Sequence, residues 1–181
     1  MTSTTATTAS TTTAASTLSG RAIIDALKRT GVEFIISVPD ICTSAGLLKP
    51  ISEDPALRLV RVCKEDEGVS ICAALSFCDQ RGVLLMQQTG LMDSLNAVRA
   101  IGVDYRNPVC MMVGLLGKEA DIAPVDSRSF GVRVITPILD VMGIRYCVLD
   151  SDRDLEAGML AVEDAYRQST PVVLLLGRNP V

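Results

Sequence analysis

The chain of 181 residues contains no histidine and no tryptophan, and only 3% of its residues are aromatic. Without histidine, Ser-His-Asp and Cys-His catalytic sites and His-ligated metal sites are excluded within this chain. The scarcity of aromatic rings also removes the stacking platforms that single-stranded nucleic acids use. The six cysteines form no Cys-x-x-Cys pair, and most lie in apolar runs. We therefore expect reduced, structural thiols, as in a cytoplasmic protein.

The sequence also lacks an excess of positive charge and any long hydrophobic run. Its 17 basic and 21 acidic residues give a net charge of −4, so no positive field attracts phosphate backbones or an anionic membrane surface. No apolar run approaches the roughly 18 residues that a membrane-spanning helix needs. With 48% hydrophobic residues, the composition is globular. We expect a small-molecule substrate and neither a nucleic-acid nor a membrane partner.

The first 17 residues differ in composition from the rest of the chain. They consist of Met1 followed only by Thr, Ser and Ala, with no charge and no large apolar side chain. Such a segment cannot form a packed core, which predicts a disordered tail over residues 1–17 and one domain over residues 18–181. The tail has neither the basic start and apolar core of a secretory signal nor the arginines of a transit peptide.

From Leu18 onward, short apolar runs alternate with segments of helical periodicity. This pattern predicts an α/β fold in three layers, with a six-stranded, mainly parallel sheet and helices on both faces. The predicted strands are Glu33–Val38, Leu57–Val62, Gly82–Gln87, Val109–Gly114, Arg145–Leu149 and Pro171–Gly177. The predicted helices are Leu18–Thr30, Ala45–Ile51, Glu65–Cys78, Leu91–Ile101, Val134–Met142 and Asp152–Gln168, and Leu116–Ser129 is a predicted long loop.

An acidic cluster follows the second predicted strand and opens a nearly uncharged helix. Acids in a first helical turn complement the helix dipole and usually face water, which is the simpler interpretation of these carboxylates. Glu65, however, shares a helical stripe with Gly68, Val69, Cys72 and Ser76, so its carboxylate points along a small, apolar surface. A partly desolvated glutamate at the carboxyl end of a strand is a candidate catalytic residue.

Polar residues also follow the first and third predicted strands, where ligands collect in parallel sheets. Gln87, Thr89 and Gly90 can bind a polar ligand, or Thr89 can simply cap a helix. Asp40, Thr43 and Lys49 can recognise an anionic substrate, or form an ordinary turn. Neither a G-x-G-x-x-G fingerprint nor a Walker lysine motif occurs, which argues against the common nucleotide-binding folds.

Several motifs occur together in a recognisable order: Val-Pro-Asp, Leu-Leu-Lys-Pro, Lys-Glu-Asp-Glu-Gly-Val and Gln-Gln-Thr-Gly-Leu with a following Ser-x-Asn-Ala. In these motifs the chain resembles the alpha subunit of sulfopyruvate decarboxylase and the matching N-terminal half of phosphonopyruvate decarboxylase. The resemblance covers residues 18–181 and implies the pyrimidine-binding domain of a thiamine diphosphate enzyme. It implies that Glu65 lies against the aminopyrimidine ring, with Gln87, Thr89, Gly90 and Asn96 near the cofactor. It also implies that Asp40, Thr43 and Lys49 face the substrate.

The chain departs from the thiamine diphosphate superfamily in one decisive feature. The Gly-Asp-Gly signature, followed about two dozen residues later by Asn, binds the diphosphate and Mg2+ in that superfamily and is absent here. The resemblance therefore implies a partner beta subunit that carries this signature, no metal ligands in this chain, and a hetero-oligomer such as a dimer or tetramer of pairs.

The substrate and the reaction outcome stay open at this stage. A 2-keto acid decarboxylase acting on 3-sulfopyruvate is the leading hypothesis, with phosphonopyruvate and a carboligase reaction as alternatives. A non-catalytic binding module of the same fold is an alternative of another class. The loop that carries His in many relatives reads Val125-Asp126-Ser127-Arg128 here. Lys49, Lys118, Arg128 and Arg133 are either anion ligands or ordinary surface charges.

Overall fold

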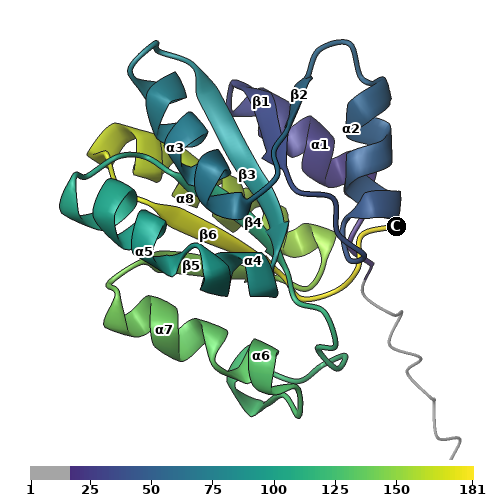
Figure 1. Cartoon of the computed structure of the whole chain (residues 1–181). Helices are drawn as coiled ribbons and strands as arrows, with labels where there is room; N and C mark the ends of the chain where they lie inside the picture. The colour runs from purple at the N-terminus through teal and green to yellow at the C-terminus, as the bar shows by residue number, and fades with distance from the viewer. Residues whose placement is uncertain (1–16) are drawn as a thin grey trace, which may run out of the picture.

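A computed structural model describes residues 17–181, and the predicted disorder of residues 1–16 lies outside this range. Its centre is one six-stranded sheet in the order β2-β1-β3-β4-β6-β5, in which every neighbouring pair is parallel (Figure 1). The strands are β1 (Val32–Ser37), β2 (Arg58–Arg61), β3 (Arg81–Gln87), β4 (Cys110–Gly114), β5 (Arg145–Leu149) and β6 (Val172–Leu176). The predicted α/β class and the six strands are confirmed.

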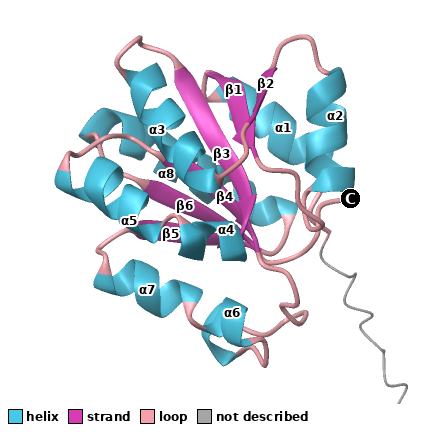
Figure 2. Ribbon diagram, in the orientation of Figure 1, coloured by secondary structure: helices cyan, strands magenta, loops and turns pink. Residues whose placement is uncertain are grey.

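Helices cover both faces of the sheet, which completes the three predicted layers (Figure 2). One face carries α1 (Gly20–Arg29), α2 (Lys49–Glu53) and α8 (Leu155–Gln168). The other carries α3 (Glu65–Ser76), α4 (Gln88–Asp93), α5 (Leu95–Ala97), α6 (Phe130–Arg133) and α7 (Ile135–Val141). Two segments, η1 (Ser44–Leu48) and η2 (Val98–Asp104), are π-helical, and two, η3 (Pro124–Asp126) and η4 (Asp152–Asp154), are single 3-10 turns. Within residues 17–181, none of the helices combines the length and apolarity needed to cross a membrane.

Alternation of side chains along the buried strands produces two separate cores. Ile35 and Leu85 pack with α1 and α8 on one side of the sheet. Ile36 and Leu84 pack with α3 and α7 on the other. Both faces of the central strands are therefore buried, as expected for a doubly covered parallel sheet.

The predicted continuous helix over Leu91–Ile101 is wrong. The segment begins earlier, at Gln88, and is divided into α4, α5 and η2. Ser94 interrupts it, because its hydroxyl donates to the carbonyl oxygens of Gly90 (2.8 Å) and Leu91 (3.2 Å) while its backbone has φ −99° and ψ 5°. Serine competes for backbone acceptors in this way inside helices. The predicted helix Ala45–Ile51 is likewise divided, into η1 and α2.

The carboxyl-terminal residues pack against the segment that follows β1. A Cβ atom on Gly46 would lie 2.0 Å from the carbonyl oxygen of Pro180, and one on Gly20 would lie 1.8 Å from that of Gly46. The Val181 amide donates to the Leu18 carbonyl oxygen over 3.0 Å. The start of α1, the η1 turn and the end of the chain thus form one stack.

The strand order reverses at β1, since the chain passes from β1 outward to β2 and then returns to β3 on the other side. The loops that leave the carboxyl ends of β1 and β3 therefore run in opposite directions. Such a reversal is where open α/β sheets place their ligands.

Candidate functional site

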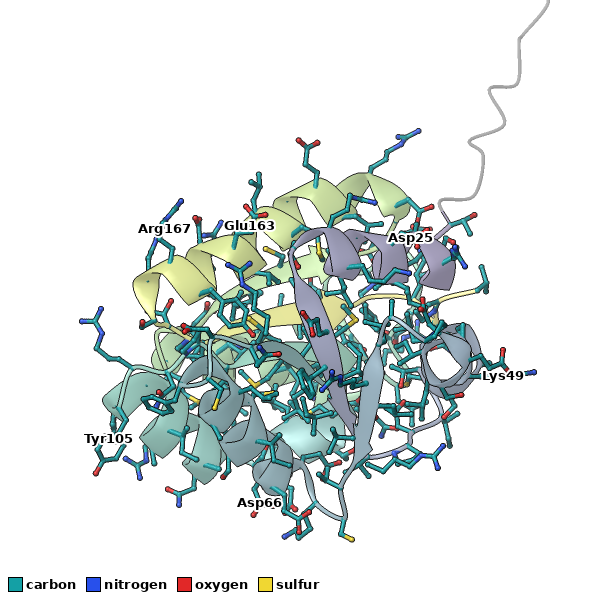
Figure 3. The ribbon with its side chains drawn as sticks, turned by 90° about the horizontal axis from the view of Figure 1, so that it is seen from above. Asp25, Lys49, Asp66, Tyr105, Glu163 and Arg167 are labelled. Carbon is teal, nitrogen blue, oxygen red and sulfur yellow. The ribbon has the colours of Figure 1, made fainter. Side chains whose placement is uncertain are left out.

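The three acids that open α3 have different structural roles. Glu67 accepts a hydrogen bond from the Cys63 amide through Oε2 (3.0 Å), and Asp66 accepts one from the Glu67 amide through Oδ1 (3.0 Å). Both carboxylates are therefore held by backbone amides at the helix start, and Asp66 points away from the sheet (Figure 3). The Glu65 carboxylate accepts no hydrogen bond from any of residues 17–181. Of the three acids, Glu65 is therefore the one whose carboxylate is available to bind a ligand.

Glu65 lies directly against Gly90 of α4. A Cβ atom on Gly90 would come within 2.2 Å of Glu65 Oε1 and 2.5 Å of its Cγ. Only glycine allows this approach, which keeps the Glu65 side chain half-buried at the carboxyl edge of the sheet. An ion pair between Lys64 Nζ and Asp93 Oδ2 (3.3 Å) also joins the start of α3 to the end of α4.

Small residues on α3 set the depth at which Glu65 is held. Gly68 packs so closely on the sheet that a Cβ atom there would lie 2.4 Å from Leu84 Cδ1. Val69 and Cys72, on the same stripe, are fully buried. The predicted stripe is confirmed, and it places Glu65 where the buried surface meets the edge of the sheet.

The junction between β3 and α4 brings further polar groups to this edge. Gln87 Nε2 donates to the hydroxyl of Thr89 (2.7 Å), the residue that immediately precedes Gly90. Thr89 lies inside the first turn of α4, where Gln87 occupies the N-cap position, so Thr89 is not the helix cap. Gln87 also pairs with Gly114 in the register of β3 and β4.

Gln88 is a site residue that the sequence analysis missed. Its side chain is buried, and it exchanges two hydrogen bonds with the backbone of Leu116, at 2.8 Å from the Leu116 amide and 3.1 Å to the Leu116 carbonyl oxygen. This amide ties α4 to the loop that leaves β4. The sequence does not distinguish Gln88 from its neighbour Gln87. The two side chains point in different directions, so Gln87 contacts Thr89 while Gln88 contacts Leu116.

The loop after β1 crosses over the end of β4. Asp40 accepts hydrogen bonds from the Thr43 amide (2.9 Å) and the Thr43 hydroxyl (2.6 Å), which forms a compact turn. A Cβ atom on Gly114 would lie 2.7 Å from Cys42 Cβ and 3.3 Å from Thr43 Cγ2. Since Gly114 is the register partner of Gln87, this turn lies beside the Gln87–Gly90 segment.

Cys42, next to this turn, is not an activated nucleophile. Burial, together with the negative charge of Asp40, raises the pKa of its thiol from 9.0 to about 11. The thiol therefore stays protonated near neutral pH, and a protonated thiol is a poor nucleophile.

Two predicted site residues lie apart from this group. Lys49 begins α2 and extends outward from it (Figure 3). Asn96 is exposed on α5, where its Oδ1 accepts hydrogen bonds from the Arg99 guanidinium (3.1 and 3.3 Å). Their proposed ligand contacts stay predictions.

The loop after β4 is fixed by buried and charged contacts. The side chain of Lys118 is fully buried, and its ammonium contacts Asp150 Oδ1 (3.1 Å) and the Glu119 carbonyl oxygen (3.3 Å). Glu119 accepts hydrogen bonds from the Ser127 hydroxyl (2.7 Å) and the Arg128 amide (3.0 Å), and these bonds hold the pKa of its carboxyl below the usual value. Lys118 is thus an internal ion-pair partner rather than a surface charge.

The relatives found by comparison with known proteins include several named sulfopyruvate decarboxylase subunit alpha. The one from Methanocaldococcus jannaschii is 30% identical over 156 residues, which cover 85% of this chain and 90% of the relative. The one from Methanothermobacter thermautotrophicus is 30% identical over 103 residues, which cover 57% of this chain and 62% of the relative, less than two thirds of its length. A protein from Methanosarcina acetivorans named sulfopyruvate decarboxylase is 27% identical over 158 residues, which cover 38% of it.

Comparison with solved structures finds a protein that contains the same α/β fold. A 2-oxoglutarate:ferredoxin oxidoreductase from Magnetococcus marinus, solved with 2-oxoglutarate, coenzyme A and succinyl-CoA bound, superposes with a TM-score of 0.58 at 14% identity. The superposition covers 87% of this chain and 28% of that one, and at this identity it shows the fold alone. No protein-family model matches the chain. Because the Methanocaldococcus match extends over most of both chains at 30% identity, the chain belongs to the sulfopyruvate decarboxylase alpha-subunit family.

Proposed function

We propose that this chain is the pyrimidine-domain (alpha) subunit of a heteromeric, thiamine diphosphate-dependent 2-keto acid decarboxylase. The proposed reaction converts 3-sulfopyruvate to sulfoacetaldehyde and carbon dioxide. One observation carries the proposal: Glu65, at the carboxyl edge of the sheet, is half-buried, lies against Gly90, and accepts no hydrogen bond within residues 17–181. The names of the relatives supply the substrate.

The residues around Glu65 fit one end of the proposed cofactor. Thiamine diphosphate, when bound, supplies the nucleophilic carbon and the electron sink that decarboxylation of a 2-keto acid requires. Glu65 would accept a hydrogen bond from a nitrogen of its aminopyrimidine ring. Gly90, which has no side chain, makes room for the Glu65 carboxylate at this edge, and the Gln87 amide and Thr89 hydroxyl add polar groups beside it.

The role of Glu65 in this proposal is to share a proton with that ring nitrogen. A carboxylate that already accepted hydrogen bonds from its own chain, as Glu67 does, would compete poorly for that proton. Partial burial strengthens the contact, because water competes less for the carboxylate than at an exposed position. Glu65 thus acts on the cofactor and does not touch the substrate.

The turn formed by Asp40 and Thr43 is the proposed substrate-binding part of the site. It lies against Gly114, beside the Gln87–Gly90 segment. Lys118 is already paired with Asp150, and Lys49, although it lies apart from this turn, stays the proposed charge partner of the sulfonate. Lys49 forms no ion pair with any of residues 17–181, and its ammonium is exposed.

A partner beta subunit completes the proposed enzyme. Residues 17–181 contain no group of three or more Cys, Asp or Glu side chains placed to hold a metal ion. We assign the diphosphate and Mg2+ to a partner with the Gly-Asp-Gly signature, which is absent from this sequence, and the words "subunit alpha" in the names of the relatives support such a partner. Asn96 stays a proposed cofactor contact.

The test is carbon dioxide release by this chain co-purified with a partner that carries the Gly-Asp-Gly signature. Sulfopyruvate and phosphonopyruvate are supplied separately, with thiamine diphosphate and Mg2+ present and then each omitted. Release from sulfopyruvate that requires both additions is expected. Preferential use of phosphonopyruvate would change the substrate, and an intact complex that neither binds the cofactor nor releases carbon dioxide would contradict the decarboxylase.

A further inference from the structure

One buried donor in the part of the chain that the structure describes has no acceptor. Arg178 follows β6, its side chain is 23% exposed, and its Nε atom is buried without a hydrogen-bond partner. Among residues 17–181, it is the one buried side-chain nitrogen or oxygen atom in this state. Buried polar groups are almost always hydrogen-bonded, and an unpaired donor lowers stability. The Arg178 guanidinium is therefore a candidate ligand contact.

The ion pair of Arg178 uses only part of its guanidinium. Nη2 donates to Asp121 Oδ1 over 2.6 Å, whereas Nε, on the same edge of the planar group, contacts neither oxygen of that carboxylate. A carboxylate that matched the guanidinium would accept from both nitrogens. The side chain of Asp121 is also 84% exposed, and exposed ion pairs contribute little to stability. The Arg178–Asp121 pair is thus incomplete and readily exchanged.

The backbone of Asp121 is in an unfavourable conformation. Its φ of 59° lies in the left-handed region, which residues with a side chain adopt rarely. Residues in such conformations are held by their surroundings, and they cluster at ligand-binding sites and in switch segments. The contact with Arg178 is one of the constraints on this backbone. Release of Asp121 from Arg178 would therefore let the loop after β4 relax.

Arg178 lies at the same edge of the sheet as the proposed substrate-binding turn. Leu176, the last residue of β6, pairs with Gly114, the last residue of β4. The substrate-binding turn packs on Gly114. Just after Arg178, the carbonyl oxygen of Pro180 lies against Gly46, which belongs to the same loop after β1. The loop after β1 therefore contacts the sheet edge and the chain end that flank Arg178.

The two lysines considered for the charge of the substrate differ from Arg178. The side chain of Lys118 is fully buried, and its ammonium contacts Asp150 Oδ1 over 3.1 Å, so its charge is already compensated. Lys49 extends outward from α2 and lies apart from the turn (Figure 3). Arg178 combines a position at this edge with a donor that no other group uses.

We propose that Arg178 binds the sulfonate group of the substrate, and that Asp121 is an exchangeable counter-ion that leaves Arg178 when the substrate binds. The proposal rests on the proposed function and names the residue that recognises the anionic end of its substrate. Two of the three sulfonate oxygens match Nε and Nη2 of a guanidinium, so binding satisfies the donor that Asp121 leaves unpaired. Lys49, as an ammonium, adds charge but no such paired contact.

The experiment is calorimetric titration of the complex between the full chain and its partner with 3-sulfopyruvate. Thiamine diphosphate is omitted, so that binding is measured without turnover. Arg178→Gln should raise the Kd by about tenfold or more, because it removes both the charge and the paired donors. Arg178→Lys keeps the charge alone and should restore only part of the affinity. Binding of pyruvate, which has no sulfonate, should change by less than about twofold.

The Asp121→Asn variant separates substrate binding from a structural role. If the ion pair only holds the loop, Arg178→Gln and Asp121→Asn lose the same contact and change the Kd in the same direction. If Asp121 competes with the sulfonate, Asp121→Asn should instead lower the Kd by about twofold to fivefold. Arg167→Gln and Asp164→Asn are the matched controls, because they remove an exposed ion pair on α8, and both should stay within about twofold of the wild type.

An unchanged Kd in a folded Arg178→Gln variant would overturn the proposal. A raised Kd in Asp121→Asn, a loss of affinity confined to Lys49→Gln, or a wild-type complex that does not bind sulfopyruvate would also overturn it. If Arg178→Gln lowers the thermal unfolding midpoint, the exposed Asp121→Asn decides by the direction of its effect.

Failure of the proposed function is seen in a separate measurement. Thiamine diphosphate and Mg2+ are added to the same complexes, and carbon dioxide release is followed. Sulfopyruvate binding that depends on Arg178, in a wild-type complex that releases no carbon dioxide, would support the sulfonate contact and contradict the decarboxylase. Release that is equal in Arg178→Gln and the wild type, at sulfopyruvate concentrations below the KM, would support the decarboxylase and contradict the role of Arg178.

Discussion

Glu65 and Glu67 are two residues apart on α3, yet the structure gives them different tasks. The Glu65→Gln variant, measured in the complex with its partner, should lower kcat/KM for the 2-keto acid by roughly 10²–10⁴-fold, because an amide cannot share a proton with a ring nitrogen. Glu67→Gln is the control, since its remaining side-chain oxygen can still accept from the Cys63 amide. Turnover by Glu65→Gln equal to that of Glu67→Gln would remove Glu65 from the mechanism.

Gly90 determines where the Glu65 carboxylate lies. In Gly90→Ala the new methyl group would lie 2.2 Å from Oε1, so the flexible end of Glu65 moves while the backbone stays in place. We expect a loss of roughly 10²-fold in kcat with an unchanged unfolding midpoint, since small misplacements of a catalytic group have costs of this size. Gly131→Ala serves as the comparison, because its Cβ atom would meet nothing closer than 3.8 Å. Equal activities of the two variants would contradict this positioning role.

At the scale of elements, Gln88 joins α4 to the loop after β4 through both ends of its amide. Gln88→Leu leaves the amide and carbonyl groups of Leu116 without their partner, which should lower the free energy of unfolding by about 1–3 kcal/mol. Urea unfolding measures this, with the exposed Gln168→Leu on α8 as a control expected to stay within about 0.5 kcal/mol of the wild type. A Gln88→Leu variant as stable as Gln168→Leu would show that the loop is held by other contacts.

The strands were predictable because each is a short apolar run of high β-propensity, and Arg145–Leu149 agrees with the structure at both ends. The division of the helix after β3 was not predictable from periodicity, since it depends on a hydrogen bond made by one serine. The stripe from Glu65 to Cys72 was predictable because helical spacing alone defines it. Lys118 and Asp150 are 32 residues apart, so no local pattern indicates their contact.

At the scale of the whole molecule, the buried thiols should make the protein less stable at alkaline pH. Burial raises the pKa of Cys110 to about 12, and burial together with Asp40 raises that of Cys42 to about 11. The folded chain therefore keeps protons that the unfolded chain releases above its ordinary thiol pKa of 9.0. The contribution of these thiols to the free energy of unfolding should be constant below about pH 9 and fall as the pH rises toward about 11–12.

Urea unfolding under reducing conditions, at about pH 8 and about pH 10.5, measures this effect. Cys42→Ala should reduce the difference between the two values, whereas Cys63→Ser, at an exposed thiol, should leave it unchanged. A wild-type protein equally stable at both pH values would indicate that these thiols ionise freely in the folded state.

The stack formed by Gly20, Gly46 and Pro180 has a practical consequence for handling the protein. The last residues support the η1 turn, which directly follows the proposed substrate residues Asp40 and Thr43. An affinity tag attached after Val181 would therefore join the chain beside that turn, where a bulky or charged extension pushes on its backbone. A tag placed before Met1 is separated in sequence from α1 by the whole Thr-rich segment, so purification and immobilisation through the amino terminus should not load the proposed substrate-binding turn.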